Sequence, residues 1–159
     1  MKRRFFLAVL SLCALGSLIG LGQKAAKPVF AATWKLNLAK STYSPGPAPK
    51  SQVAILAAVA NGMSVVSDRV DADGQKVHFE WTAMFDGNDY PVKGDASRDS
   101  VSVKKIDDYN LEITNKKGGK VTTTIKAAYD KDGKHRVETV SGANAQGQAI
   151  KNVTSWDRQ

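Results

Sequence analysis

From Ser51 onward, apolar and polar residues alternate in short runs that are separated by turn signals. The runs are about 7 to 10 residues long and rich in Val, Ile, Thr, Phe and Tyr, which is typical of half-buried strands. Asn-Gly and Asp-Gly pairs favour tight hairpins because both residues accept a positive φ. The pattern predicts strands near 51–60, 63–71, 75–85, 89–93, 100–106, 110–116, 120–129, 134–142 and 148–157.

The order of these strands predicts an all-β fold. Strands joined by tight turns form an antiparallel up-and-down meander, and a sheet of nine or ten strands tends to curl. Closing the sheet into a barrel removes its exposed edges. No segment after the first thirty residues shows a sustained helical period, so we expect almost no helix in the main domain.

The first 31 residues have the three parts of a secretory signal peptide. Residues 2–4 are basic, and an apolar run that we expect to be helical extends from Phe5 to Gly22. Val29 and Ala31 fit the small-residue positions of a cleavage site. We expect cleavage after Ala31, with Ala32 as the alternative, and a single domain over 32–159. The competing interpretation is an uncleaved anchor, because the apolar run approaches the ~20 residues that cross a bilayer.

Export sets several further expectations. The one cysteine, Cys13, lies in the leader, so the mature chain has no disulfide, and Leu12 before it disfavours a lipoprotein signal. Five of the 23 Lys and Arg and none of the 15 Asp and Glu precede residue 33, so the remainder carries a net charge of only +3. That balance disfavours a nucleic-acid partner. We expect a periplasmic or secreted monomer without stable membrane insertion after cleavage.

Two segments interrupt the regular pattern. Residues 44–50 hold three prolines and predict an extended connector between a short first strand and the main sheet. Residues 53–60 are apolar on both faces of the predicted strand, which requires a cover or leaves an adhesive patch. The connector is a candidate for that cover.

Thr33-Trp34-Lys35-Leu36-Asn37 resembles the opening strand of the calycins, the group of lipocalins and fatty-acid-binding proteins. In that group a basic residue from the end of the chain packs on the Trp, so the resemblance implies barrel closure by a cation–π contact between Trp34 and Arg158. Ala32 stands where the group has Gly. The Pro-Gly-Pro-Ala-Pro connector, residues 86–92 and the Lys-Lys-Gly-Gly-Lys turn resemble small exported bacterial proteins of unassigned function that are described as lipocalin-like.

The residues give little support for catalysis, metal binding or a cofactor. His78 and His135 are the only imidazoles, and no serine lies in a nucleophile elbow. Two Asp-x-Asp-Gly turns, at 71–74 and 130–133, resemble the start of a calcium loop, but their twelfth positions are Thr82 and Ser141 instead of Glu. We expect no enzyme activity, no metal and no cofactor.

A barrel interior is either filled by side chains or holds a small ligand. The candidate lining residues are apolar and lie on one face of each strand: Val65, Phe79, Trp81, Val103, Ile113, Ile125 and Val137. A second set, Arg69, His78, Glu80 and Lys104, lies either outside or inside as polar anchors. We therefore expect a non-enzymatic binding protein for a small hydrophobic molecule. The alternative is an envelope-interaction protein with a filled core that docks through residues 53–60.

Overall fold

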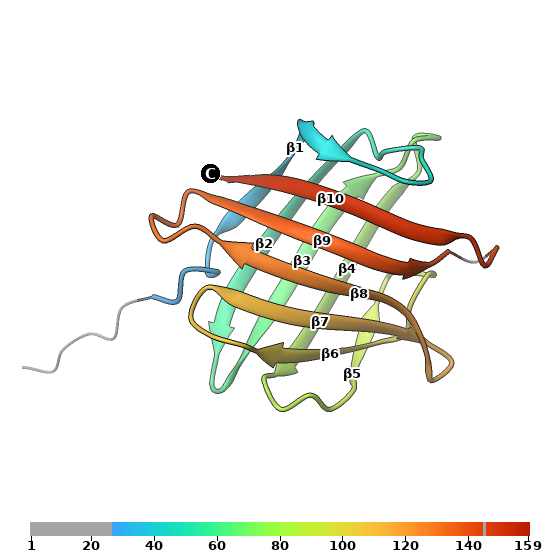
Figure 1. Ribbon diagram of the computed structural model, residues 1–159. Helices are drawn as coiled ribbons and strands as arrows, with labels where there is room; N and C mark the ends of the chain where they lie inside the picture. Colours follow the sequence, from blue (N-terminus) through green and yellow to red (C-terminus); the bar gives the residue numbers. More distant parts are fainter. Residues whose placement is uncertain (1–26, 145) are drawn as a thin grey trace, which may run out of the picture.

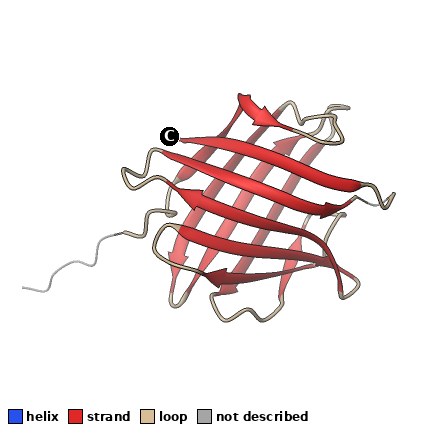
Figure 2. Cartoon of the chain, in the orientation of Figure 1, coloured by secondary structure: helices blue, strands red, loops and turns tan. Residues whose placement is uncertain are grey.

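The computed structural model describes residues 27–144 and 146–159, and these form one closed antiparallel barrel of ten strands (Figure 1). Each strand pairs with its neighbours in the chain, and β1 closes the ring against β10. The described residues contain strands and loops and no helix (Figure 2). The predicted all-β meander and its closure are confirmed; the leader proposed for residues 1–31 lies outside the described residues as far as Ala26. The strands are β1 Thr33–Thr42, β2 Ser51–Val59, β3 Gly62–Val70, β4 Lys76–Met84, β5 Tyr90–Lys93, β6 Ser100–Lys105, β7 Asn110–Lys117, β8 Lys120–Tyr129, β9 His135–Ala143 and β10 Ala149–Arg158.

The alternation of side chains divides each strand between the interior and the solvent. On β4, Phe79, Trp81 and Ala83 are buried while the intervening residues are more exposed. The alternation continues along the whole length of β3 and β4, whose nine register pairs show no shift. The sequence therefore fixes the interior face strand by strand.

The barrel has one packed end and one open end. At the packed end, the core includes Trp34, Val103, Leu111 and Tyr129, all at most 5% exposed. The open end, which we call the mouth, carries the loops at 43–50, 71–75, 94–99 and 118–119. The C-terminus lies at the packed end, where the backbone N–H of Gln159 donates to the carbonyl of Thr33 at 3.0 Å.

The connector at 44–50 lies at the mouth and does not cover the outer face of β2. Pro47 and Pro49 line the interior cavity described below. The backbone N–H groups of Lys151 and Ser44 tie the connector to β10, the first to the Ser44 carbonyl at 2.7 Å and the second to Asn152 Oδ1 at 2.9 Å. The expectation that the connector covers residues 53–60 was wrong, because the bend at the end of β1 carries the chain across the mouth.

The doubly apolar strand β2 contributes to both faces of the barrel. Ala54 and Leu56 are buried inside, whereas Ile55 on the outer face is 52% exposed. The outer face of β2 is thus accessible in the monomer.

Candidate functional site

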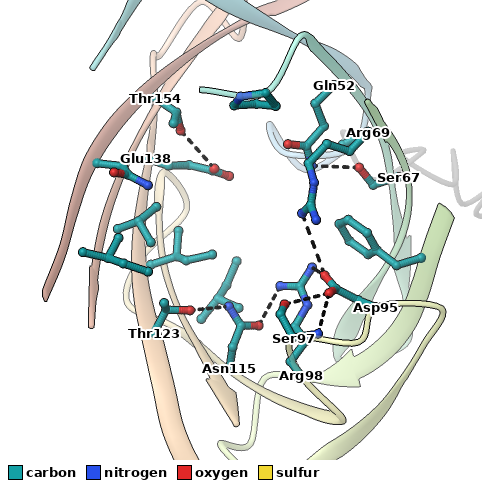
Figure 3. Close-up of a pocket in the computed structure, with 18 of the residues that line it drawn as sticks. Gln52, Ser67, Arg69, Asp95, Ser97, Arg98, Asn115, Thr123, Glu138 and Thr154 are labelled. Carbon is teal, nitrogen blue, oxygen red and sulfur yellow. Dashed lines mark hydrogen bonds and ion pairs between the residues drawn. The ribbon is translucent and has the colours of Figure 1, made fainter. Parts of the chain in front are cut away.

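A cavity of about 890 Å³ occupies the mouth half of the barrel (Figure 3). Its size is in the range of small-molecule sites, which run from about 300 to 1,000 Å³. Side chains from strands and mouth loops line it, and the strands that carry them are paired on both sides, so the walls are fixed before any ligand arrives.

Much of the cavity wall is apolar. Aliphatic and aromatic side chains come from β2, β3, β4 and from β7 to β10, and they give the site a large surface on which an apolar molecule loses contact with water. These apolar residues are Ala54, Leu56, Met63, Val65, Phe79, Trp81, Ile113, Ile125, Val140, Ile150 and Trp156.

Arg69 points its guanidinium into the cavity from β3 (Figure 3). Its Nε and Nη2 donate to the two carboxylate oxygens of Asp71 at 2.6 and 3.4 Å, which holds the guanidinium in place. Its Nη1 lies 3.9 Å from Asp95 Oδ2, too far for a hydrogen bond. Arg69 therefore presents a positioned donor group with unused hydrogens to the cavity.

A second charged group comes from the loop between β5 and β6. Asp95 Oδ1 accepts hydrogen bonds from Ser97 N at 3.0 Å and Ser97 Oγ at 2.6 Å, and its Oδ2 lies 3.2 Å from Arg98 Nη2. Burial pushes the pKa of Asp95 upward, but the Ser97 hydrogen bonds and the charges of Arg98 and Arg69 outweigh it and hold the pKa below its usual value. Asp95 is therefore ionised at neutral pH.

Arg98 is oriented by three neighbours. Besides its pairing with Asp95, its Nη1 donates to Asn115 Oδ1 at 2.8 Å, and its guanidinium lies 4.4 Å from the centroid of the Phe79 ring. Only 12% of the side chain is exposed, and its Nε has no hydrogen-bond partner among the described residues. This Nε is closed off from the cavity as well as from water, so it is a cost of the fold and not a contact offered to a ligand.

The floor of the cavity is formed by a buried ion pair under aromatic rings. Arg136 Nη1 lies 3.2 Å from Glu138 Oε1, and the guanidinium sits 4.4 Å from the Trp156 ring centroid and 5.3 Å from that of Trp34. Glu138 Oε2 accepts from Thr154 Oγ1 at 3.3 Å, as drawn in Figure 3, and from Trp156 Nε1 at 3.1 Å. The pair separates the cavity from the packed end.

Tyr43 reaches the cavity from the connector at the mouth. Burial, together with the negative charge of Glu138, raises its pKa to about 12, although the charge of Arg69 acts in the opposite direction. Tyr43 therefore stays a neutral phenol at physiological pH.

The structure brings five of the seven predicted lining residues together: Val65, Phe79, Trp81, Ile113 and Ile125 all line the cavity. Val103 is fully buried but belongs to the packed end and does not reach the cavity. Val137 was placed wrongly. It is 40% exposed on the outer face of β9, because the inward phase of that strand belongs to Arg136, Glu138 and Val140.

The predicted closing contact is also corrected. Trp34 and Arg158 are register partners across β1 and β10, as expected. However, the guanidinium over the Trp34 ring belongs to Arg136, while Arg158 donates to the carbonyls of Gly133 at 3.2 Å and Ala31 at 3.3 Å. Arg158 thus ties backbone segments together at the packed end, and Arg136 takes its place over the Trp34 ring.

Most of the charged cavity residues were missed in the sequence. Asp95, Arg98, Arg136 and Glu138 carried no motif, and Arg69 was grouped with three residues that lie outside. The available signal is phase: Arg69 is four residues after Val65 on β3, so both share the inward face. His78, Glu80 and Lys104 of the same set are exposed.

The two histidines lie on the outer surface. His78 Nδ1 is 2.7 Å from Asp68 and His135 Nδ1 is 2.8 Å from Asp157, with imidazole side chains 61% and 46% exposed. Within the described ranges, no group of three or more His, Cys, Asp or Glu side chains is arranged to hold a metal ion. The same described ranges contain no helix that is long and apolar enough to cross a membrane.

Comparison of the chain with protein-family models and with curated protein sequences finds no match.

Proposed function

We propose that this protein binds a small amphipathic molecule inside the barrel and carries it after export, without transforming it. The observation that carries the proposal is the cavity of about 890 Å³, whose apolar wall meets two positioned arginines near the mouth. The expected ligand has an apolar body and one anionic or acceptor-rich group. The apolar body packs against β7 to β10, and the acceptor group lies at Arg69 Nη1, which faces the cavity without a hydrogen-bond partner.

The charges of the described cavity support a single acceptor group. Arg69 is paired with Asp71, Arg98 with Asp95, and Arg136 with Glu138, so each guanidinium of the cavity is balanced by a carboxylate, and Lys117 is the further cation in the lining. The free hydrogens on Arg69 favour one charge-assisted contact, which is stronger than a neutral hydrogen bond. The outer placement of His78 and His135 supports a carrier in preference to an enzyme that uses an imidazole base.

The test uses two fluorescent probes with the same aromatic skeleton. Anilinonaphthalene sulfonate carries an anionic group and phenylnaphthylamine lacks it, so their difference isolates the head-group contact. We expect both probes to bind the full barrel. Arg69→Gln should weaken binding of the sulfonate about tenfold, the effect of losing one charge-assisted hydrogen bond, and leave the neutral probe unchanged.

A matched pair on β9 locates the binding. Val140→Trp places an indole in the cavity and should abolish binding of both probes, whereas Thr139→Trp on the adjacent outward position should leave binding intact. If the unmodified protein binds neither probe, or if Val140→Trp binds as well as Thr139→Trp, the proposal is wrong.

The exposed outer face of β2 favours a second candidate, docking to an envelope partner through Ile55. Ile55→Ser tests this candidate alone, because Leu56 lines the cavity and its substitution would alter both sites. Loss of partner capture with unchanged probe binding would support docking; unchanged capture would refute it.

A further inference from the structure

Residues Pro28–Ala32, which we call the N-terminal plug, are packed into the closed end of the barrel ahead of the first strand. Phe30 is 3% exposed, and its ring meets Phe85 edge-on at a centroid distance of 5.9 Å. The backbone N–H of Ala31 donates to the Pro28 carbonyl at 3.0 Å, which turns the segment back toward the barrel. The plug is thus part of the core.

The plug also accepts hydrogen bonds from side chains of the first strand and the last strand. Trp34 Nε1 donates to the carbonyl of Phe30 at 2.9 Å, and Trp34 is fully buried, so no water can replace this acceptor without a rearrangement. Arg158 Nη2 donates to the carbonyl of Ala31 at 3.3 Å. Loss of the plug would orphan the Trp34 donor and remove one of the two backbone carbonyls to which Arg158 donates.

These contacts bear on where the exported chain begins. The small-residue rule favours a cut after Ala31, but that cut removes Phe30 and both acceptor carbonyls from the folded domain. We infer that the leader is removed ahead of Pro28 and that the plug stays in the mature protein. The inference rests on the proposed export and does not depend on any ligand in the cavity.

The sequence offers a cleavage position that preserves the plug. Gly20 and Gly22 place small residues at the third and first positions before the Gly22–Gln23 bond, directly at the end of the apolar run. A cut there leaves Gln23 to Lys27 as a short tail before the plug.

Intact-mass analysis of the full chain, recovered from the periplasm of an expressing bacterium, tests the position of the cut. We expect a mass that begins at Gln23, and any N-terminus from Gln23 to Pro28 supports retention of the plug. A chain that begins at Ala32 or Thr33, or a chain that keeps its leader, overturns the inference.

Thermal unfolding tests the structural reason separately. The midpoint of a chain that begins at Ala32 should lie about 10 °C or more below that of a chain that begins at Lys27. Phe30→Ala in the longer chain should lower the midpoint in the same direction, while Lys27→Ala at an exposed position serves as the matched control. Equal midpoints for the two chain lengths would show that the plug contributes nothing to the fold.

Discussion

Replacing Glu138 by Gln should strongly destabilise the barrel, because it leaves the Arg136 guanidinium charged and buried without an anion. The Arg136 side chain is 4% exposed, and its other polar contact is the Tyr129 hydroxyl at 3.3 Å. Breaking a buried ion pair from one side costs about 3 to 5 kcal/mol. This is a large share of the 5 to 15 kcal/mol by which domains are typically stable. Arg136→Met leaves the Glu138 carboxylate with two remaining donors, Thr154 and Trp156, so its cost should lie at the lower end.

Urea unfolding followed by tryptophan fluorescence measures these costs, with the double variant Arg136→Met/Glu138→Gln closing the cycle. Because the double variant buries no unpaired charge, it should be more stable than the sum of the two single losses predicts, by at least about 2 kcal/mol. A loss below about 1 kcal/mol for Glu138→Gln, or strict additivity of the two changes, would refute the view that these residues form a coupled pair.

Three further outcomes are expected. Gly94→Ala should lower the free energy of unfolding in urea by at least about 2 kcal/mol, since Gly94 has φ +83° and an added Cβ would collide with the His78 carbonyl. Gly119→Ala is the control and should cost less, because a Cβ at Gly119 meets open space. The pKa of Asp95 is lowered in the fold, so its ionised form should stabilise the protein above the unfolded pKa of about 4, and this stability should be lost as the pH falls through the folded pKa. Asp95→Asn should therefore flatten the decline of the urea midpoint below pH 4. An unchanged decline would contradict this. The raised pKa of Tyr43 means that its contribution to stability is complete below the unfolded pKa of about 10 and is lost as the pH rises toward 12. A phenolate absorbance titration of Tyr43→Phe should therefore lose a step near pH 12, and loss of a step near pH 10 instead would place Tyr43 in water.

The barrel could be predicted from the sequence because its information is local. Alternation and Asn-Gly or Asp-Gly turns define each hairpin, as at Asn61, which takes φ +53° between β2 and β3. The connector was harder to place, because its course is set by hydrogen bonds from β10, more than a hundred residues away. No pattern within residues 44–50 encodes that contact.

The cavity was only partly predictable. The alternation along β4 predicts that apolar residues such as Phe79 and Trp81 point inward. A charged residue at an inward position of a strand is normally expected to be solvated, so the same pattern does not predict it inside. Arg69 and Arg98 are held inside by Asp71 and Asp95, which lie only two and three residues away in the chain, but such short-range pairs are equally common on solvated surfaces and so give no sign of burial. Val137 was predicted to point inward because it is an apolar residue between two charged ones, Arg136 and Glu138. Nothing in the sequence indicates that these two charges form a buried ion pair.

The ring of strands is not equally strong around its circumference. β5 has four residues and is joined by two register pairs to β4 and by two to β6, whereas β9 and β10 share nine. Backbone amide protons of β5 should therefore exchange with deuterium sooner than those of β9 and β10, because local opening at β5 breaks fewer hydrogen bonds. Local opening is therefore concentrated beside the loop that carries Asp95 and Arg98, so exchange of the proposed ligand would be easiest through this side of the barrel.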